Sequence, residues 1–140
     1  MTQSQRILLV SDEESGRFLP AALEQRGFEV AITQDTEEAY RQLLGSEFDL
    51  AIVDLAEAIN AVEFVKRVRA TPKLNKTFVL TIAEWGTGQP TLALSQGADA
   101  YEPKPIDATR LVAAVERLLR QDMVKSVAAT NESGGIETDE

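Results

Sequence analysis

The chain has no cysteine and no histidine among its 140 residues. The lack of cysteine excludes disulfide bonds and thiolate metal sites. The lack of histidine removes the commonest general base, the commonest metal ligand and any histidine phosphocarrier. Basic residues are also few, since 14 of them against 23 acidic residues give a net charge of −9. That charge has the wrong sign for a protein that binds nucleic acid or anionic lipid through electrostatics.

Long apolar runs are missing as well. The longest strongly apolar runs, residues 7–10 and 50–53, are far too short to cross a membrane. The start is not typical of a secretory signal, because residues 3–6 are polar. With 44% hydrophobic and 26% charged residues, the composition is that of an ordinary globular domain. We therefore expect a soluble, cytoplasmic protein that binds neither nucleic acid nor membrane.

Short apolar runs alternate with helical patterns along the chain. Apolar runs without period-two alternation are typical of strands that are covered on both faces. The runs predict strands over residues 6–10, 28–33, 48–53, 78–82 and 98–101, and the helical spacings predict helices over 14–26, 36–44, 61–70, 90–96 and 107–122. This strict alternation predicts an α/β fold in which five helices flank a doubly wound sheet of five parallel strands.

Single residues refine the expected helices. Pro20 predicts either a kink in the first helix or a regular helix that begins near it. In the third helix, Lys66, Arg67 and Arg69 fall outside the apolar face, so we expect them to point to solvent. Asp107 is a good N-cap for the last helix.

The composition changes after residue 122. Residues 123–140 hold four acids against one lysine, and such a polar segment cannot bury enough apolar surface to offset its ordering entropy. We therefore expect one folded domain over residues 1–122 and a disordered acidic tail over 123–140. This division leaves no room for an output domain, so we expect either a stand-alone relay protein or a domain cut from a longer chain.

Polar side chains follow several of the expected strands where each strand ends. Asp12 follows the first strand, Asp54 the third, and Lys104 the fifth. Ligands of open parallel sheets bind outside the carboxyl ends of the strands, so these residues converge on the usual site. Clustered carboxylates without histidine or cysteine suit a hard divalent cation, and Mg²⁺ is the first choice.

Each of these residues also has a plainer explanation. An aspartate after a strand is more often a turn or helix-start residue, and a lone lysine is more often a solvated surface residue. The only glycine-x-glycine, at residues 86–88, lacks the rest of any nucleotide fingerprint. The convergence of two acids and a lysine on one edge is what favours a functional site.

Over residues 6–122 the chain resembles the receiver domain of two-component response regulators. Four motifs carry the resemblance: ILLVSDE at residues 7–13, FDLAIVD at 48–54, GADAY at 97–101, and Lys104-Pro105. The resemblance implies a flavodoxin-like fold with strand order 2-1-3-4-5. It also implies that the Lys104–Pro105 peptide bond is often cis.

The same resemblance implies a role for each candidate site residue. Asp54 would accept a phosphoryl group from a histidine kinase or phosphotransfer protein in a Mg²⁺-dependent reaction. Asp12, Asp54 and the backbone carbonyl of Ala56 would bind Mg²⁺, and Lys104 would pair with the phosphoryl oxygens. Tyr101 would be the switch aromatic that changes its exposure on activation. Phosphoryl transfer of this kind needs positioning and charge stabilisation rather than a protein base.

Four residues depart from the family pattern. Ala58 and Val62 replace a usual proline and glycine in the loop and helix after Asp54, where they would reshape the loop. The other two departures concern the site. Ser11 stands where the family usually has a first acidic residue, so Mg²⁺ should bind more weakly. Ile82 stands where the family has a threonine or serine whose hydroxyl contacts the phosphoryl group. Thr81 is adjacent, but neighbouring side chains of a strand point to opposite faces. Only a local slip or bulge would let Thr81 substitute as the switch residue.

These observations leave two functions in view. The first is a phosphorylatable receiver that signals to an unknown downstream protein; it is not an enzyme beyond self-catalysed phosphotransfer and autodephosphorylation. A homodimer would use the face formed by residues 90–96, 98–101 and 107–122. The alternative is a pseudo-receiver, an interaction module that keeps the fold without the switch. A metal-dependent hydrolase is disfavoured, because no further general acid or base is visible.

Overall fold

A computed structural model describes residues 5–12, 17–84 and 94–130 of the chain. Five parallel strands form one sheet in the order β2-β1-β3-β4-β5. The strands are β1 (Arg6–Ser11), β2 (Glu29–Thr33), β3 (Leu50–Asp54), β4 (Phe78–Glu84) and β5 (Ala100–Lys104). The predicted flavodoxin-like, doubly wound fold and its strand order are confirmed.

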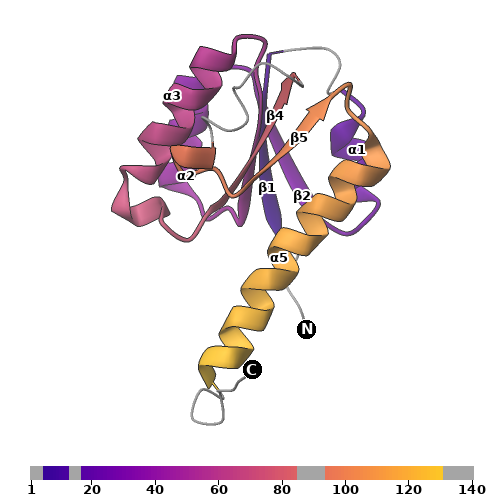
Figure 1. Ribbon diagram of the computed structural model, residues 1–140, viewed down its shortest axis with the longest axis vertical. Coiled ribbons are helices and arrows are strands. Elements are labelled where there is room, and N and C mark those ends of the chain that lie inside the picture. The colour runs from indigo at the N-terminus through magenta and orange to yellow at the C-terminus, as the bar shows by residue number, and fades with distance from the viewer. Residues whose placement is uncertain (1–4, 13–16, 85–93, 131–140) are drawn as a thin grey trace.

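Helices cover both faces of this sheet. The described residues contain α1 (Leu19–Glu24), α2 (Thr36–Gly45), α3 (Ala58–Arg69), a short 3₁₀ helix η2 (Pro72–Leu74) and α5 (Ala108–Thr130). Figure 1 shows α2 and α3 on one face of the sheet and α1 and α5 on the other. Most of the helix expected over residues 90–96 lies outside the described residues, although Leu94 and Ser95 are helical.

Alternating side chains of the strands divide the core into two clusters. Val10, Val53 and Val79 belong to the cluster that packs on α2 and α3, whereas Ile52 and Ile82 belong to the one that packs on α1 and α5. Because β1 and β3 are buried on both faces, their sequences read as continuous apolar runs rather than as alternating patterns. The same alternation decides which face each residue at the carboxyl ends of the strands occupies.

The boundaries of α1 and β5 differ from the expected ones. Helix α1 begins at Leu19 with Pro20 in its first turn, so the second of the two readings of Pro20 is confirmed. Strand β5 runs to Lys104 and includes Pro103, although the sequence predicts a strand that ends at residue 101. Proline is tolerated there because β5 is an edge strand. Lys104 therefore belongs to the strand itself.

Helix α5 is longer than predicted. It begins after Asp107, whose carboxylate accepts from the backbone N–H of Arg110 at 3.0 Å, as expected of an N-cap. It continues past residue 122 to Thr130, so residues 123–130 of the expected tail are helical, and residues 131–140 lie outside the described residues. That stretch contains neither glycine nor proline and includes good helix formers. Figure 1 shows the end of α5 extending past the sheet.

Arg69 does not point to solvent, and this expectation was wrong. Its guanidinium donates to the backbone carbonyl of Gly97 at 2.8 Å and to the carboxylate of Asp99 at 2.6 Å. It also donates to the carbonyl of Leu74 at 3.3 Å. Asp99 in turn accepts from the backbone N–H of Val79 at 2.8 Å. Arg69 thus ties the end of α3 to η2 and to the starts of β4 and β5.

None of the helices in the described ranges is long and apolar enough to cross a membrane.

Candidate functional site

Asp54 is the last residue of β3 and is completely buried. Its carboxylate Oδ2 accepts a hydrogen bond from the hydroxyl of Ser11 at 3.0 Å. The two residues are register partners at the ends of the adjacent strands β1 and β3. Burying a carboxylate costs considerable free energy of desolvation, and buried charged groups of this kind are concentrated at functional sites. Asp54 is therefore a strong candidate for a functional residue.

Lys104 approaches the same carboxylate from the other side. Its Nζ lies 3.8 Å from Oδ1 of Asp54, and its side chain is 19% exposed. The ammonium therefore offsets the charge of Asp54 and still reaches solvent. The Lys104–Pro105 peptide bond is cis, as the family resemblance implies. The acid and the lysine, 50 positions apart in the sequence, thus meet at the carboxyl edge of the sheet.

Asp12 lies beside this pair on the segment that follows β1. Its backbone N–H donates to the carbonyl of Asp54 at 3.3 Å, and its exposed carboxylate accepts from the N–H of Ala56 at 2.9 Å. The three residues named as Mg²⁺ ligands are therefore neighbours that offer only oxygen donors, which suits this ion. The described residues contain no cluster of three acids. The donor set fits Mg²⁺ with two carboxylates.

The register of β4 shows which of two residues, Thr81 or Ile82, lies beside Asp54. Val53 pairs with Thr81, so the next position, Ile82, lies beside Asp54. Pairing with β5 continues without interruption from Leu80 to Glu84, so these pairs contain no slip or bulge. Ile82 belongs to the core cluster of Ile52, which is two positions from Asp54 on the same face. The β4 residue beside Asp54 is therefore apolar.

Thr81 lies on the opposite face of the sheet, toward α3. It is 1% exposed, and within the described part of the chain its hydroxyl has no hydrogen-bond partner. Its register partner on β5 is Tyr101, which is half-buried on the same face. Of the three predicted switch residues, Thr81 and Tyr101 are brought together, and Ile82 is separated from them by the sheet.

Sequence reasoning did not anticipate the hydrogen bond from Ser11 to Asp54. It treated Ser11 only as a missing acid, although the serine faces the acceptor directly. The implied strand order places Ser11 and Asp54 near the ends of adjacent strands, but it specifies neither the register nor the side-chain rotamers on which the bond depends. Glu13, Trp85 and the glycine pair at residues 86–88 lie outside the described residues.

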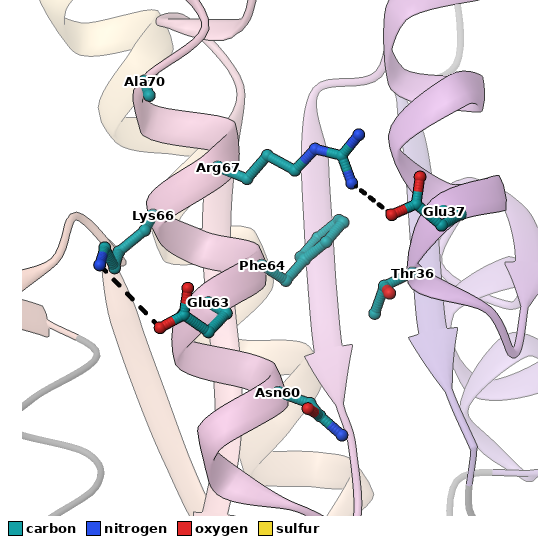
Figure 2. A pocket seen from close by; sticks show the side chains of 8 residues that line it. All are labelled: Thr36, Glu37, Asn60, Glu63, Phe64, Lys66, Arg67 and Ala70. Carbon is teal, nitrogen blue, oxygen red and sulfur yellow. Dashed lines mark hydrogen bonds and ion pairs between the residues drawn. The ribbon is translucent and has the colours of Figure 1, made fainter.

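A groove of about 490 Å³ between α2 and α3 is a separate feature. Figure 2 shows Arg67 of α3 reaching across to Glu37 of α2, with Phe64 between the helices. The ion pair has an N–O distance of 2.7 Å, and its hydrogen bond raises the pKa of Arg67 above the usual value. The same guanidinium stacks on the ring of Tyr40 at 3.9 Å. These contacts join the two helices, and none of the predicted site residues lines the groove.

Comparisons with known proteins show the family and the fold of the chain. The chain matches the family described as the response regulator receiver domain over residues 7–116. It therefore belongs to the response regulator receiver domain family.

Two relatives illustrate how similar the chain is to known sequences. It is 30% identical over 126 residues to the response regulator ArlR of Staphylococcus saprophyticus, which covers 87% of this chain and 56% of the relative. It is also 30% identical over 133 residues to ArlR of Staphylococcus aureus, which covers 94% of this chain and 58% of the relative. The chain thus spans little more than half the length of these relatives.

Solved structures show the same fold. An orphan response regulator of H. pylori, HP1043, superposes with a TM-score of 0.72 at 28% identity, covering 81% of this chain and 95% of that one. The chemotaxis response regulator CheY4 of Vibrio cholerae superposes with a TM-score of 0.74 at 24% identity, covering 82% of this chain and 98% of that one. At 24% identity, the second comparison supports the fold alone.

Proposed function

We propose that this chain is a phosphorylatable receiver in which Asp54 accepts a phosphoryl group from a phosphohistidine. The donor would be a histidine kinase or a phosphotransfer protein, because this chain has no histidine of its own. The observation that carries the proposal is the completely buried Asp54 carboxylate with the Lys104 ammonium 3.8 Å away. The two charges meet at the edge where ligands of open parallel sheets bind.

Each residue of the pocket has a distinct part in the proposed reaction. Asp54 is the nucleophile, and burial shields it from competing solvent contacts. Lys104 offers a positive charge to the oxygens of the arriving phosphoryl group. Asp12, Asp54 and the carbonyl of Ala56 would hold Mg²⁺, which would neutralise part of the phosphoryl charge. The chain would act as a signalling domain in the cytoplasm, with only self-catalysed phosphotransfer and autodephosphorylation as its own chemistry.

The surface around the pocket suits contact with a partner protein. Three of the four exposed large hydrophobic residues of the described chain lie at the carboxyl edge of the sheet. They are Phe18 before α1, Ile32 near the end of β2, and Ile59 at the start of α3. Exposed apolar side chains around a charged pocket are typical of a protein contact site. The donor would dock here, and the downstream protein or a second copy of the chain would use the face of β5 and α5.

A pseudo-receiver is the second candidate, and the position of Ile82 favours it. An apolar side chain beside Asp54 cannot donate a hydrogen bond to a phosphoryl oxygen. The buried Thr81 hydroxyl lies on the other face, so it does not replace that donor. In this alternative the chain would act through its surface alone.

The chain's single tryptophan, Trp85, provides a test because it directly follows β4. We expect its fluorescence to change when Mg²⁺ and then beryllofluoride are added, and we expect Asp54→Asn to abolish the response to beryllofluoride. A flat titration of the wild-type protein, together with an unchanged intact mass after incubation with acetyl phosphate, would support the pseudo-receiver instead.

Ile82→Thr tests whether the missing hydroxyl weakens the switch. Because Ile82 lies beside Asp54, a threonine there can donate to the phosphoryl group. We expect the phosphorylated form to last longer, or the change in Trp85 fluorescence to become larger. Thr81→Ser is the matched control on the opposite face and should leave the lifetime unchanged.

A further inference from the structure

The two oxygens of the Asp54 carboxylate have different neighbours. Oδ2 points to β1, where the buried Ser11 hydroxyl donates to it at 3.0 Å. Oδ1 points to β5, where Nζ of Lys104 lies 3.8 Å away. The first distance is a hydrogen bond to a charged acceptor, and the second exceeds hydrogen-bond length. Ser11 is thus the closer of these two contacts of the carboxylate.

We infer that Ser11 is a positioning residue for Asp54: its hydroxyl holds Oδ2 and presents Oδ1, beside Lys104, as the oxygen that accepts the phosphoryl group. This inference rests on the proposed function. In the transfer, a lone pair of Oδ1 forms the new bond to phosphorus. The bond from phosphorus to the donor atom breaks, and its electron pair leaves with the imidazole nitrogen or the acetate oxygen. Asp54 neither takes nor gives a proton in this step.

The neutral side chain of Ser11 also sets the charge balance of the pocket. An acid at position 11 would place a second negative group beside a carboxylate that is completely buried, and such a pair repels strongly at low dielectric. Ser11 instead donates a hydrogen bond to the Asp54 carboxylate, where an acid would repel it. Because Ser11 is neutral, no divalent ion is needed to offset repulsion between Asp54 and the residue at position 11. Restoring an acid at this position should make the stability of the fold respond more strongly to Mg²⁺.

The first experiment compares phosphorylation of Ser11→Ala, Ser11→Thr and the wild-type protein by acetyl phosphate. Ser11→Ala should lower the maximal rate about tenfold, the size expected for a lost hydrogen bond to a charged group, without changing the half-saturating concentration of acetyl phosphate. Ser11→Thr keeps the hydroxyl and should restore most of the rate. Ser46→Ala, at an exposed serine after α2, is the control and should behave as wild type.

Urea unfolding of each variant checks that it folds before its rate is read. If Ser11→Ala reacts as fast as the wild type, or if Ser11→Thr is as slow as Ser11→Ala, the positioning role is wrong. A rise in the half-saturating concentration at an unchanged maximal rate would also contradict it, because Ser11 would then act on donor binding.

The second experiment needs no phosphoryl transfer and separates this inference from the proposed function. We expect Ser11→Asp to lower the unfolding midpoint in EDTA, and we expect Mg²⁺ to raise that midpoint by more than it raises the wild-type midpoint. If the wild-type protein takes up no phosphoryl group, the proposed function fails. The comparison of unfolding midpoints with and without Mg²⁺ then tests the role of Ser11 on its own. A Ser11→Asp midpoint that responds to Mg²⁺ no more than the wild-type midpoint would overturn it.

Discussion

The two ends of the sheet use charged side chains differently. At the amino end, the Arg69 guanidinium is 2.6 Å from the Asp99 carboxylate, a closed and charge-assisted hydrogen bond. At the carboxyl end, Nζ of Lys104 lies 3.8 Å from Oδ1 of Asp54. This distance is too long for a hydrogen bond, so the two groups interact as an ion pair only. Arg69 and Asp99 also bond to backbone groups of neighbouring segments. Asp54 is instead contacted by the side chains of Ser11 and Lys104. The pair at the amino end is a direct hydrogen bond between two partly exposed side chains, whereas the pair at the carboxyl end places a completely buried carboxylate beside a lysine that still reaches solvent.

The largest effect on stability should come from Arg69→Ala. Its partly buried guanidinium bonds to Gly97, Leu74 and Asp99, and removal would leave the Asp99 carboxylate without its cation. We expect the free energy of unfolding in urea to fall by about 3 kcal/mol. Arg67→Ala, which removes an exposed ion pair from the same helix, is the control and should cost clearly less. Equal losses would break the distinction between the two kinds of pair.

Asp54→Asn should have the opposite sign. Asparagine keeps the shape of the side chain but removes a charge whose burial opposes folding, and Lys104 can still reach water. We expect the free energy of unfolding, measured in EDTA, to rise by about 1 kcal/mol. Asp99→Asn is the matched change at the amino end and should lower it. If both variants lose stability to the same extent, the two ends of the sheet do not differ as described.

Thr81→Val should give a gain of similar or smaller size. The Thr81 hydroxyl is buried without a hydrogen-bond partner in the described chain. Valine has the same shape without the hydroxyl, so the substitution removes the desolvation penalty of that group. We expect about 1 kcal/mol of added stability. Thr77→Val is the control, because the buried Thr77 hydroxyl donates to the Phe48 carbonyl at 3.3 Å and its loss should destabilise. A loss in both variants would show that Thr81 has a partner in solution.

The smallest effect should come from Glu38→Gln on the exposed surface of α2. The hydrogen bond from Arg41 lowers the pKa of Glu38 below its usual value. A carboxylate with a lowered pKa in the folded state contributes stability above its unfolded pKa and loses it as the pH falls through its folded pKa. We therefore expect a slight decrease in the thermal midpoint at neutral pH that disappears in acid. A difference that persists in acid would rule out this ion pair as the cause.

Most of the fold was predictable because strands that are buried on both faces consist almost entirely of apolar residues. The runs at residues 6–10 and 48–53 are almost wholly apolar because both faces of β1 and β3 are covered. The end of α5 was less predictable. Its last residues are polar enough to suggest a tail, yet helix propensity without glycine or proline carries the helix to Thr130.

The convergence of the candidate site residues was predictable, but their contacts were not. Asp12, Asp54 and Lys104 follow from the rule that the carboxyl ends of parallel strands share one edge. The bond from Ser11 to Asp54 depends on the register of β1 against β3 and on two side-chain rotamers. The Arg69 contacts depend on a loop that approaches α3 from a distant part of the sequence. Periodicity along a single helix carries no information about such partners.

The most direct test of the central claim is the intact mass of the protein after incubation with acetyl phosphate and Mg²⁺, followed by mapping of the modified residue. We predict that the wild-type protein gains one phosphoryl group on Asp54, and that Asp54→Asn gains none. A wild-type protein that gains no mass, or that carries the group on another residue, would contradict the account.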